Sequence, residues 1–233
     1  LVEACATLFQ ALDLCQQPHA GRTRALVILN LVEGLGELGD TERAVDYAKQ
    51  CVAEFEALDQ PMYLSHALVA EGRAWLALAR EDEAERRFQR AVNLATLAFG
   101  TAFAMMFFAF FSYMTRIWHF SLPLAGLAVT PGPLMVVPTA IVAGRIAART
   151  GHRPILVTGS LIYAASGLWL LLVPGTEPAY ATQWLPGLFL SGIGVGMVLP
   201  SLSGAAVAGL PAAQYAVGSA VNQATRQLGS VLG

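Results

Sequence analysis

Long stretches without a charged residue are the feature that most constrains the fold of this chain. Asp, Glu, Lys and Arg are absent from residues 91–115, 117–144, 154–176 and 178–225. A helix needs about 20 predominantly apolar residues to cross the hydrocarbon core of a bilayer, and each stretch reaches that length. A water-soluble surface carries charges throughout, so these stretches predict helices that lie in a membrane.

Charge also divides the chain into two parts. Residues 1–97 carry 9 Lys and Arg and 15 Asp and Glu, whereas residues 98–233 carry five Arg, one Glu and no Lys or Asp. The sequence therefore predicts a water-soluble domain over residues 1–97 and a membrane domain over residues 98–233. We expect a lipid bilayer as the partner of the second part and no nucleic-acid partner.

The membrane domain is expected to contain about five helical spans. Residues 178–225 are too long for one crossing at about 1.5 Å per residue, and Gly209-Leu-Pro211 is the predicted break. The expected spans are 98–117, 124–144, 154–174, 184–208 and a segment that begins near residue 213.

A short basic stretch orients these spans. Arg145, Arg149, His152 and Arg153 lie between two apolar segments and predict a tight loop. Short cationic loops stay on the cytoplasmic side of a membrane. Counting spans backward places the N-terminal region in the cytoplasm, so we expect a multi-pass protein of the inner (plasma) membrane.

Residues 1–97 repeat with a period of 40 and predict helices near 1–15, 21–38, 40–57, 61–79 and 81–97. Small or apolar residues recur in register: Ala44 with Ala84, Ala48 with Phe88, Cys51 with Ala91, and Leu35 with Trp75. The small residues Ala44 and Ala84 at the first repeated position let two helices approach closely. Larger residues fill the space beyond.

This pattern resembles the tetratricopeptide family, in the longer-period form of bacterial regulators. Leu-Gly-Asp-Thr-Glu-Arg-Ala at 38–44 is similar to that family's turn into its second helix, and Gly72 keeps the family's glycine where Val32 departs from it. The resemblance implies a protein or peptide partner on a concave face; the alternative is that the repeat packs only on itself or on a neighbour. The residues expected to pack the repeat are Ala44, Gly72, Trp75, Ala84 and Phe88.

The second part resembles the major facilitator superfamily, specifically its fourteen-span drug:proton antiporter branch. The stretch from Gly144 to Arg153 is similar to that family's cytoplasmic loop motif, although Ala148 replaces the usual aspartate. Residues 125–133, 192–200 and 218–229 also resemble family stretches. The loop motif is carried here by Gly144, Arg145, Arg149, Gly151 and Arg153.

The resemblance implies an all-α fold, with tetratricopeptide-like hairpins before a partial transporter bundle. It also implies that the N-terminal half of the transporter is missing and would be a partner. Because no Asp or Glu lies in the predicted spans, a proton-coupling carboxylate would belong to that half.

Arg226 is the expected contact with substrate inside the membrane. It lies 13 residues beyond the predicted start of its span, roughly 20 Å along the helix axis and past the middle of a core about 30 Å thick. An arginine at that depth should face protein or a water-filled cavity. Asn222 and Gln223 would line the same cavity; a purely structural role for Arg226 is the alternative.

Enzymatic motifs are not evident in the sequence. Three cysteines without C-x-x-C spacing predict neither a disulfide framework nor a zinc site. Gly34, Gly36 and Gly39 spell a dinucleotide fingerprint, but they continue a helical pattern instead of following a strand. We therefore expect no catalytic, cofactor or metal site.

Two functions remain open from the sequence. The first is a fragment of a multidrug efflux-type transporter that is not competent alone. The second is a tetratricopeptide-type interaction module anchored to the membrane, or accidentally fused to transporter spans.

Overall fold

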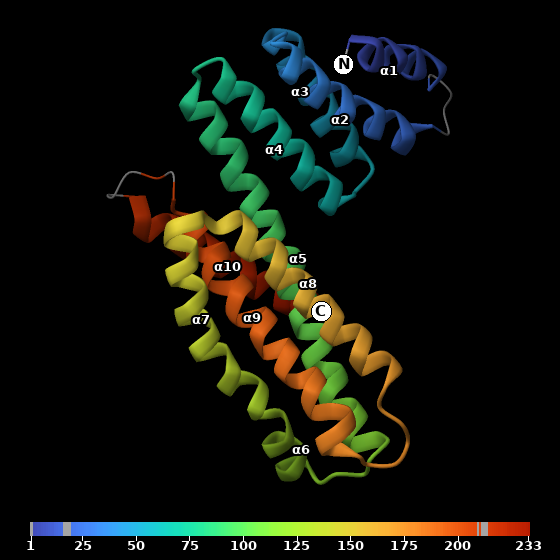
Figure 1. Cartoon of the computed structure of the whole chain (residues 1–233), viewed down its shortest axis with the longest axis vertical. Helices are drawn as coiled ribbons and strands as arrows, with labels where there is room; N and C mark the ends of the chain where they lie inside the picture. Colours follow the sequence, from blue (N-terminus) through green and yellow to red (C-terminus); the bar gives the residue numbers. More distant parts are fainter. Residues whose placement is uncertain (1, 16–19, 209, 211–213) are drawn as a thin grey trace. The chain divides into compact units, whose positions relative to one another are not determined.

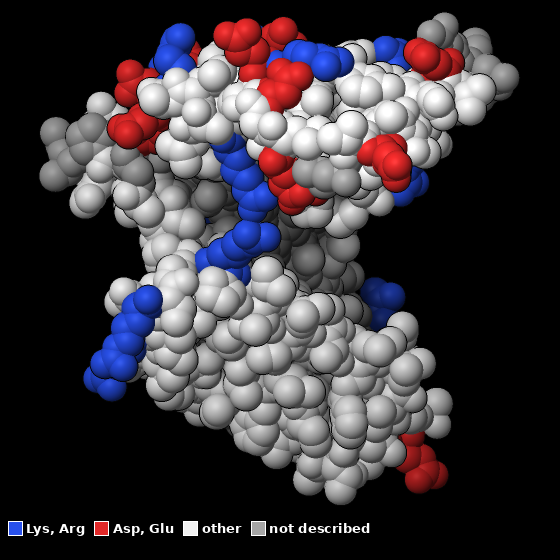
Figure 2. Space-filling model, turned by 45° about the horizontal axis from the view of Figure 1, so that its top comes forward, with Lys and Arg blue, Asp and Glu red and all other residues white. Residues whose placement is uncertain are grey.

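The computed structural model describes residues 2–15, 20–208, 210 and 214–233. Within these ranges the regular structure is helical and contains no strand, which confirms the expected all-α class (Figure 1). The chain forms two compact units, residues 1–98 and residues 99–233. Charged side chains gather on the first unit, and the second shows an almost uncharged face (Figure 2).

The first unit is a row of helices in which sequence neighbours pack side by side. These are α1 (Val2–Leu14), α2 (Gly21–Leu38), α3 (Thr41–Ala57), α4 (Pro61–Ala77) and the start of α5 (Glu81–Arg116). The bounds of α1 to α4 agree with the sequence prediction within two residues. Helix α2 ends because Gly39 adopts a φ of 79° and donates its N–H to the last carbonyls. Pro61 begins α4, where its missing N–H costs no helical hydrogen bond.

Small residues allow the close packing of this unit. Ala44 and Ala84 are buried, and a Cβ atom at Gly72 of α4 would come within 2.6 Å of the Phe88 ring on α5. The apolar interior is continuous through α2, α3 and α4, with Ile28, Cys51, Phe55 and Leu68 at or near zero exposure.

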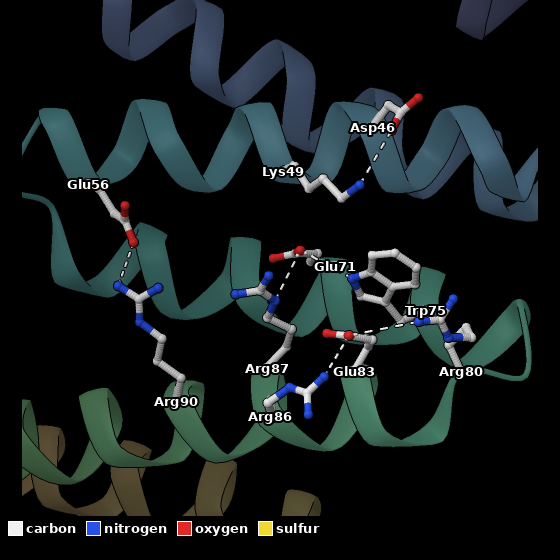
Figure 3. A network of polar contacts seen from close by, with 10 residues as sticks. All are labelled: Asp46, Lys49, Glu56, Glu71, Trp75, Arg80, Glu83, Arg86, Arg87 and Arg90. Carbon is white, nitrogen blue, oxygen red and sulfur yellow. Dashed lines mark hydrogen bonds and ion pairs between the residues drawn. The ribbon is translucent and has the colours of Figure 1, made fainter.

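Polar contacts join α4 to the first turns of α5 (Figure 3). Glu71 is only 1% exposed; it accepts a hydrogen bond from Trp75 Nε1 at 3.2 Å and pairs with Arg87 Nε at 3.0 Å. Glu83 pairs with Arg86 at 2.6 Å at the surface. Lys49 and Arg80 each lie over the Trp75 ring, 5.0 and 5.6 Å from its centroid.

The second unit contains the rest of α5 and five further α-helices in its described residues. They are α6 (Leu122–Val129), α7 (Pro131–Thr150), α8 (His152–Leu172), α9 (Leu185–Ala205) and α10 (Tyr215–Leu232), with a π-helical turn η1 (Tyr180–Trp184) before α9. Helix α9 packs along both α7 and α8 and forms the centre of the unit (Figure 1).

Glycines on two sides of α9 explain this arrangement. Gly192 and Gly196 face α7, where a Cβ atom at Gly196 would come within 2.7 Å of the Val136 carbonyl oxygen. Gly187 and Gly194 face α8, where a Cβ atom at Gly194 would come within 2.9 Å of Tyr163 Cα. Small residues let helix backbones approach where no hydrophobic force drives association, as in a bilayer. The glycine run of α9 is therefore a packing device on both of its sides.

Four helical segments in the described residues are long and apolar enough to cross a membrane: Glu81–Arg116, Leu122–Thr150, His152–Leu172 and Tyr180–Ala205. The first continues without a break past residue 97, where the sequence analysis expected a new helix to begin. The fifth expected span corresponds to α10, whose polar side chains lower its hydropathy, so its crossing stays a prediction.

Candidate functional site

The basic motif lies where α7 and α8 meet. Gly151 alone joins the two helices, with φ at 80°, so Gly144, Arg145 and Arg149 belong to the last turns of α7 and not to a loop. Gly144, Arg145, Arg149, Gly151 and Arg153 are all exposed. The predicted tight connection is thus tighter than expected, because the left-handed glycine reverses the chain in one residue. The cytoplasmic position of this end stays a prediction.

Helix α9 contributes to the same end of the unit. A Cβ atom at Gly204 would come within 2.9 Å of His152 Nε2, so the imidazole at the start of α8 packs directly on α9. Nδ1 of His152 is buried and makes no hydrogen bond to the described residues.

At the other end of these helices, aromatic side chains at the C-terminal end of α5 hold the loop that follows α8. Tyr113 Oη and Trp118 Nε1 both donate to the Gly175 carbonyl, at 2.8 and 2.9 Å, and the Gly175 N–H donates to Gln183 Oε1 at 3.0 Å. Trp184 is 2% exposed and contacts the rings of Tyr113 and Trp118, with centroids 5.2 and 5.3 Å away. The loop after α8 is therefore fixed through one glycine.

An apolar cavity of about 260 Å³ lies among α5, α7, α8 and α9. Its polar side chains are Ser191 and Tyr163; most of the wall is aliphatic or aromatic. Six of the lining residues show its character: Phe103, Phe107, Phe110, Val136, Leu188 and Val195. The cavity was not predicted from the sequence. Its signal in the sequence is the spacing of Phe103, Phe107 and Phe110, which recur at i, i+4 and i+7 on one face of α5 and all line the cavity.

Arg226 lies at a second cavity, of about 270 Å³, between α5, α9 and α10. Gly100, Phe103, Leu199, Gln227 and Ser230 complete its lining. Arg226 Nη2 donates to Gln223 Oε1 at 2.7 Å, so the structure brings these two predicted residues together. Asn222 is 4% exposed and does not line this cavity. Whether any of the three contacts a substrate stays a prediction.

The first unit carries a separate cavity of about 350 Å³ between α2 and α4. Glu33, Glu37 and Arg73 supply its charges, and Val32 and Ala70 supply apolar wall. The predicted repeat residues lie elsewhere: Ala44 and Ala84 are buried between helices, and Trp75 belongs to the polar network of Figure 3.

No group of three His, Cys, Asp or Glu side chains in the described part of the chain could hold a metal ion. Burial and the nearby Glu54 carboxylate raise the pKa of the Cys51 thiol to about 12, so this cysteine is a poor nucleophile. The second unit therefore combines helices that are long and apolar enough to cross a membrane with an apolar cavity between them, and such a cavity can hold an apolar ligand.

Comparison with known proteins identifies the family. Residues 48–233 match the Major Facilitator Superfamily, and the chain belongs to it. The match begins inside the first unit, so it includes α4 and most of α3 as well as all the membrane-capable helices. The tetratricopeptide resemblance and the fourteen-span branch stay predictions.

Three curated relatives are similar to this chain, and two of them are named as transporters. A probable actinorhodin transporter of Streptomyces coelicolor is 29% identical over 73% of this chain and 30% of its own length. A triacylglyceride transporter of Mycobacteroides abscessus is 36% identical over 40% of the chain and 20% of its own length. A multidrug resistance protein B homolog of Mycobacterium tuberculosis is 31% identical over 64% of the chain and 28% of its own length.

The chain thus spans 30% or less of the length of these relatives. No solved structure matches it.

Proposed function

We propose that residues 99–233 form part of the substrate pathway of a major facilitator exporter for apolar small molecules, of the multidrug efflux kind. The observation that carries this proposal is the apolar cavity among α5, α7, α8 and α9. A pocket lined mainly by aromatic and aliphatic side chains binds ligands through the apolar area that it removes from water. The names of the three relatives, a probable actinorhodin transporter, a triacylglyceride transporter and a multidrug resistance protein B homolog, are consistent with an apolar cargo.

Transport itself needs more than this chain. Alternating access in this family works by the rocking of two halves around a central site, and the chain spans less than a third of its relatives. We propose that a further transporter half is its partner and supplies the coupling carboxylate. Expressed alone, the chain is expected not to lower drug accumulation in cells.

We further propose an inner-membrane location with the first unit in the cytoplasm. The exposed arginines at the α7–α8 connection support this orientation, since cationic residues at span ends favour the cytoplasmic side.

Binding of an apolar probe to the whole chain tests the cavity. N-phenyl-1-naphthylamine, whose fluorescence rises in apolar surroundings, would be titrated into the chain in lipid nanodiscs, with empty nanodiscs as the blank. Val137 lines the cavity and is 64% exposed, so tryptophan at this position should fill space without disturbing the fold. Val137→Trp is expected to abolish saturable binding.

Val142→Trp is the matched control. Val142 lies on the same helix, is 54% exposed and does not line the cavity. Equal binding by both variants would remove the cavity as the substrate site and with it the support for this function.

A second function for the first unit rests on its own cavity between α2 and α4. We propose that this charged site takes a polypeptide segment, as an interaction module would. Deleting residues 1–98 from an assembled transporter separates the two functions. Unchanged insertion and transport would assign the first unit to another partner, and lost transport would make it part of the transporter.

A further inference from the structure

The two cavities of the second unit share a wall. Phe103 of α5 and Leu199 of α9 line both the apolar cavity and the Arg226 cavity. Phe103 in turn contacts Phe107, which lines the apolar cavity alone, with ring centroids 6.0 Å apart. The Phe103 and Leu199 side chains therefore separate the apolar cavity from the cavity that contains the Arg226 cation.

We propose that the two cavities form one bipartite site for an amphipathic organic anion, with its ring system in the apolar cavity and its anionic group at Arg226. This inference rests on the proposed function and adds a substrate class to it. The partition between the two compartments would be the Phe103 and Leu199 side chains, which line both cavities.

Charge complementarity is the first argument for an anion. Arg226 is the only charged residue from position 178 to the end of the chain. Its hydrogen bond goes to the neutral amide oxygen of Gln223, and no ion pair joins it to any residue that the structure describes. A guanidinium carries five N–H donors in a planar fork that matches a carboxylate or sulfonate. Arg226 is partly exposed, and a guanidinium without an ion-pair partner attracts an anion through charge-assisted hydrogen bonds.

The position of Arg226 beside the shared wall also supports a bipartite anion site. Gly100 lets α10 approach α5 so closely that a Cβ atom there would lie 2.9 Å from the Arg226 carbonyl oxygen. This contact holds the arginine beside Phe103, at the shared wall, instead of at a helix end. The same charge would repel a lipophilic cation, so the site should discriminate among drugs by the sign of their charge.

A pair of probes with the same ring systems tests the inference. The sulfonate 1-anilinonaphthalene-8-sulfonate and the uncharged N-phenyl-1-naphthylamine would be titrated into the whole chain in phosphatidylcholine nanodiscs. Arg226→Gln is expected to weaken sulfonate binding about tenfold, the loss of one charge-assisted contact, and to change binding of the neutral probe less than twofold. Arg226→Lys should keep most of the preference for the sulfonate.

Arg116→Gln is the control, because Arg116 is an exposed arginine that lines neither cavity. Unchanged binding of the neutral probe shows that each variant is folded. Tetraphenylphosphonium, a lipophilic cation, is expected not to displace the sulfonate.

The outcomes separate this inference from the proposed function. The anion site would be overturned if Arg226→Gln left sulfonate binding unchanged, or if tetraphenylphosphonium displaced the sulfonate. In either case, loss of neutral-probe binding in Val137→Trp would still support the apolar cavity. If Val137→Trp leaves both probes bound as before, the apolar cavity is not the site and both proposals fail.

Discussion

Gly100 on α5 and Arg226 on α10 touch backbone to backbone: a Cβ atom at Gly100 would lie 2.9 Å from the Arg226 carbonyl oxygen and 3.6 Å from Gly229 Cα. A carbonyl oxygen cannot move aside as a flexible side chain can. The docking of α10 on α5 therefore depends on the absence of a side chain at residue 100.

Gly100→Leu is expected to displace α10 and open the Arg226 cavity. In the probe titrations this variant should lose its preference for the sulfonate and keep its affinity for the neutral compound. Gly167→Leu on α8 is the matched control, because a Cβ atom there meets nothing within 4 Å. A preference retained in Gly100→Leu would mean that α10 is positioned by other contacts.

The two units should separate when expressed as pieces. Residues 1–98 carry nearly all the acidic groups of the chain, and residues 99–233 contain most of the membrane-capable length. We expect the first piece to be soluble and helical by circular dichroism and the second to sediment with membranes. Recovery of residues 99–233 as a soluble monomer without detergent would contradict the membrane assignment.

The buried carboxylate of Glu71 makes its partner Arg87 essential for the stability of the first unit. Arg87→Met would leave a charge that is 1% exposed with only the hydrogen bond from Trp75. Breaking a buried ion pair on one side costs about 3 kcal/mol of unfolding free energy. Urea denaturation of residues 1–98, followed by circular dichroism, measures this loss.

Arg90→Met provides the comparison for that measurement. Arg90 lies three residues further along α5 and pairs with Glu56, but both side chains are more than 40% exposed. An exposed pair contributes about 0–1 kcal/mol, so this variant should unfold almost as the parent does. Equal losses in the two variants would show that burial of Glu71 does not control the unfolding free energy. The double change Glu71→Gln with Arg87→Met should recover most of the loss, because no charge is then left buried.

Thiol reactivity should distinguish Cys51 from Cys15. Cys51 is fully buried, its Sγ donates to the Ala25 carbonyl at 3.5 Å, and burial together with the Glu54 charge raises its pKa from 9.0 to about 12. Cys15 is partly exposed. At pH 8 a disulfide reagent should modify Cys15 in the folded protein and reach Cys51 only after urea is added.

The same pKa gives a pH dependence with a defined sign. Because the folded state holds the neutral thiol, its contribution to stability is complete below pH 9 and is lost between pH 9 and about pH 12. The urea midpoint of residues 1–98 should fall over this range, and the fall should be smaller in Cys51→Ala. A midpoint that falls equally in both proteins would assign the effect to other groups.

The helices of this protein were predictable because their signals are local. The repeat with a period of 40 residues predicted the bounds of α1 to α4, and uncharged length indicated the four membrane-capable segments. Three features were not predicted. Helix α5 continues through residue 98 because nothing in the local sequence ends it, and a change in composition does not break a helix. Gly151 reverses the chain alone, whereas the basic stretch around it indicated a longer loop.

The third unpredicted feature is the apolar cavity and the wall that it shares with the Arg226 cavity, because both depend on which helices meet. Phe103 and Leu199 are 96 positions apart, and no periodicity within either helix tells that they share a wall. The prediction that Arg226 faces a cavity rested on the energy of a charge in hydrocarbon, which is a property of one residue. The residues of α5 and α9 that lie beside Arg226 could be identified only from the fold.

The glycine at 175 has a consequence for spectroscopy. The chain has four tryptophans, and three of them lie at the same end of the second unit as this residue: Trp118 donates to its carbonyl, Trp169 donates to the carbonyl of Gln183, and Trp184 stacks on Tyr113. The fourth, Trp75, lies in the first unit. A Trp75→Phe protein would therefore have all of its indole chromophores at one end of the membrane unit. With Trp118 and Trp184 only 5.3 Å apart, their near-ultraviolet absorption should be coupled, and the opening of that end could be followed without an attached label.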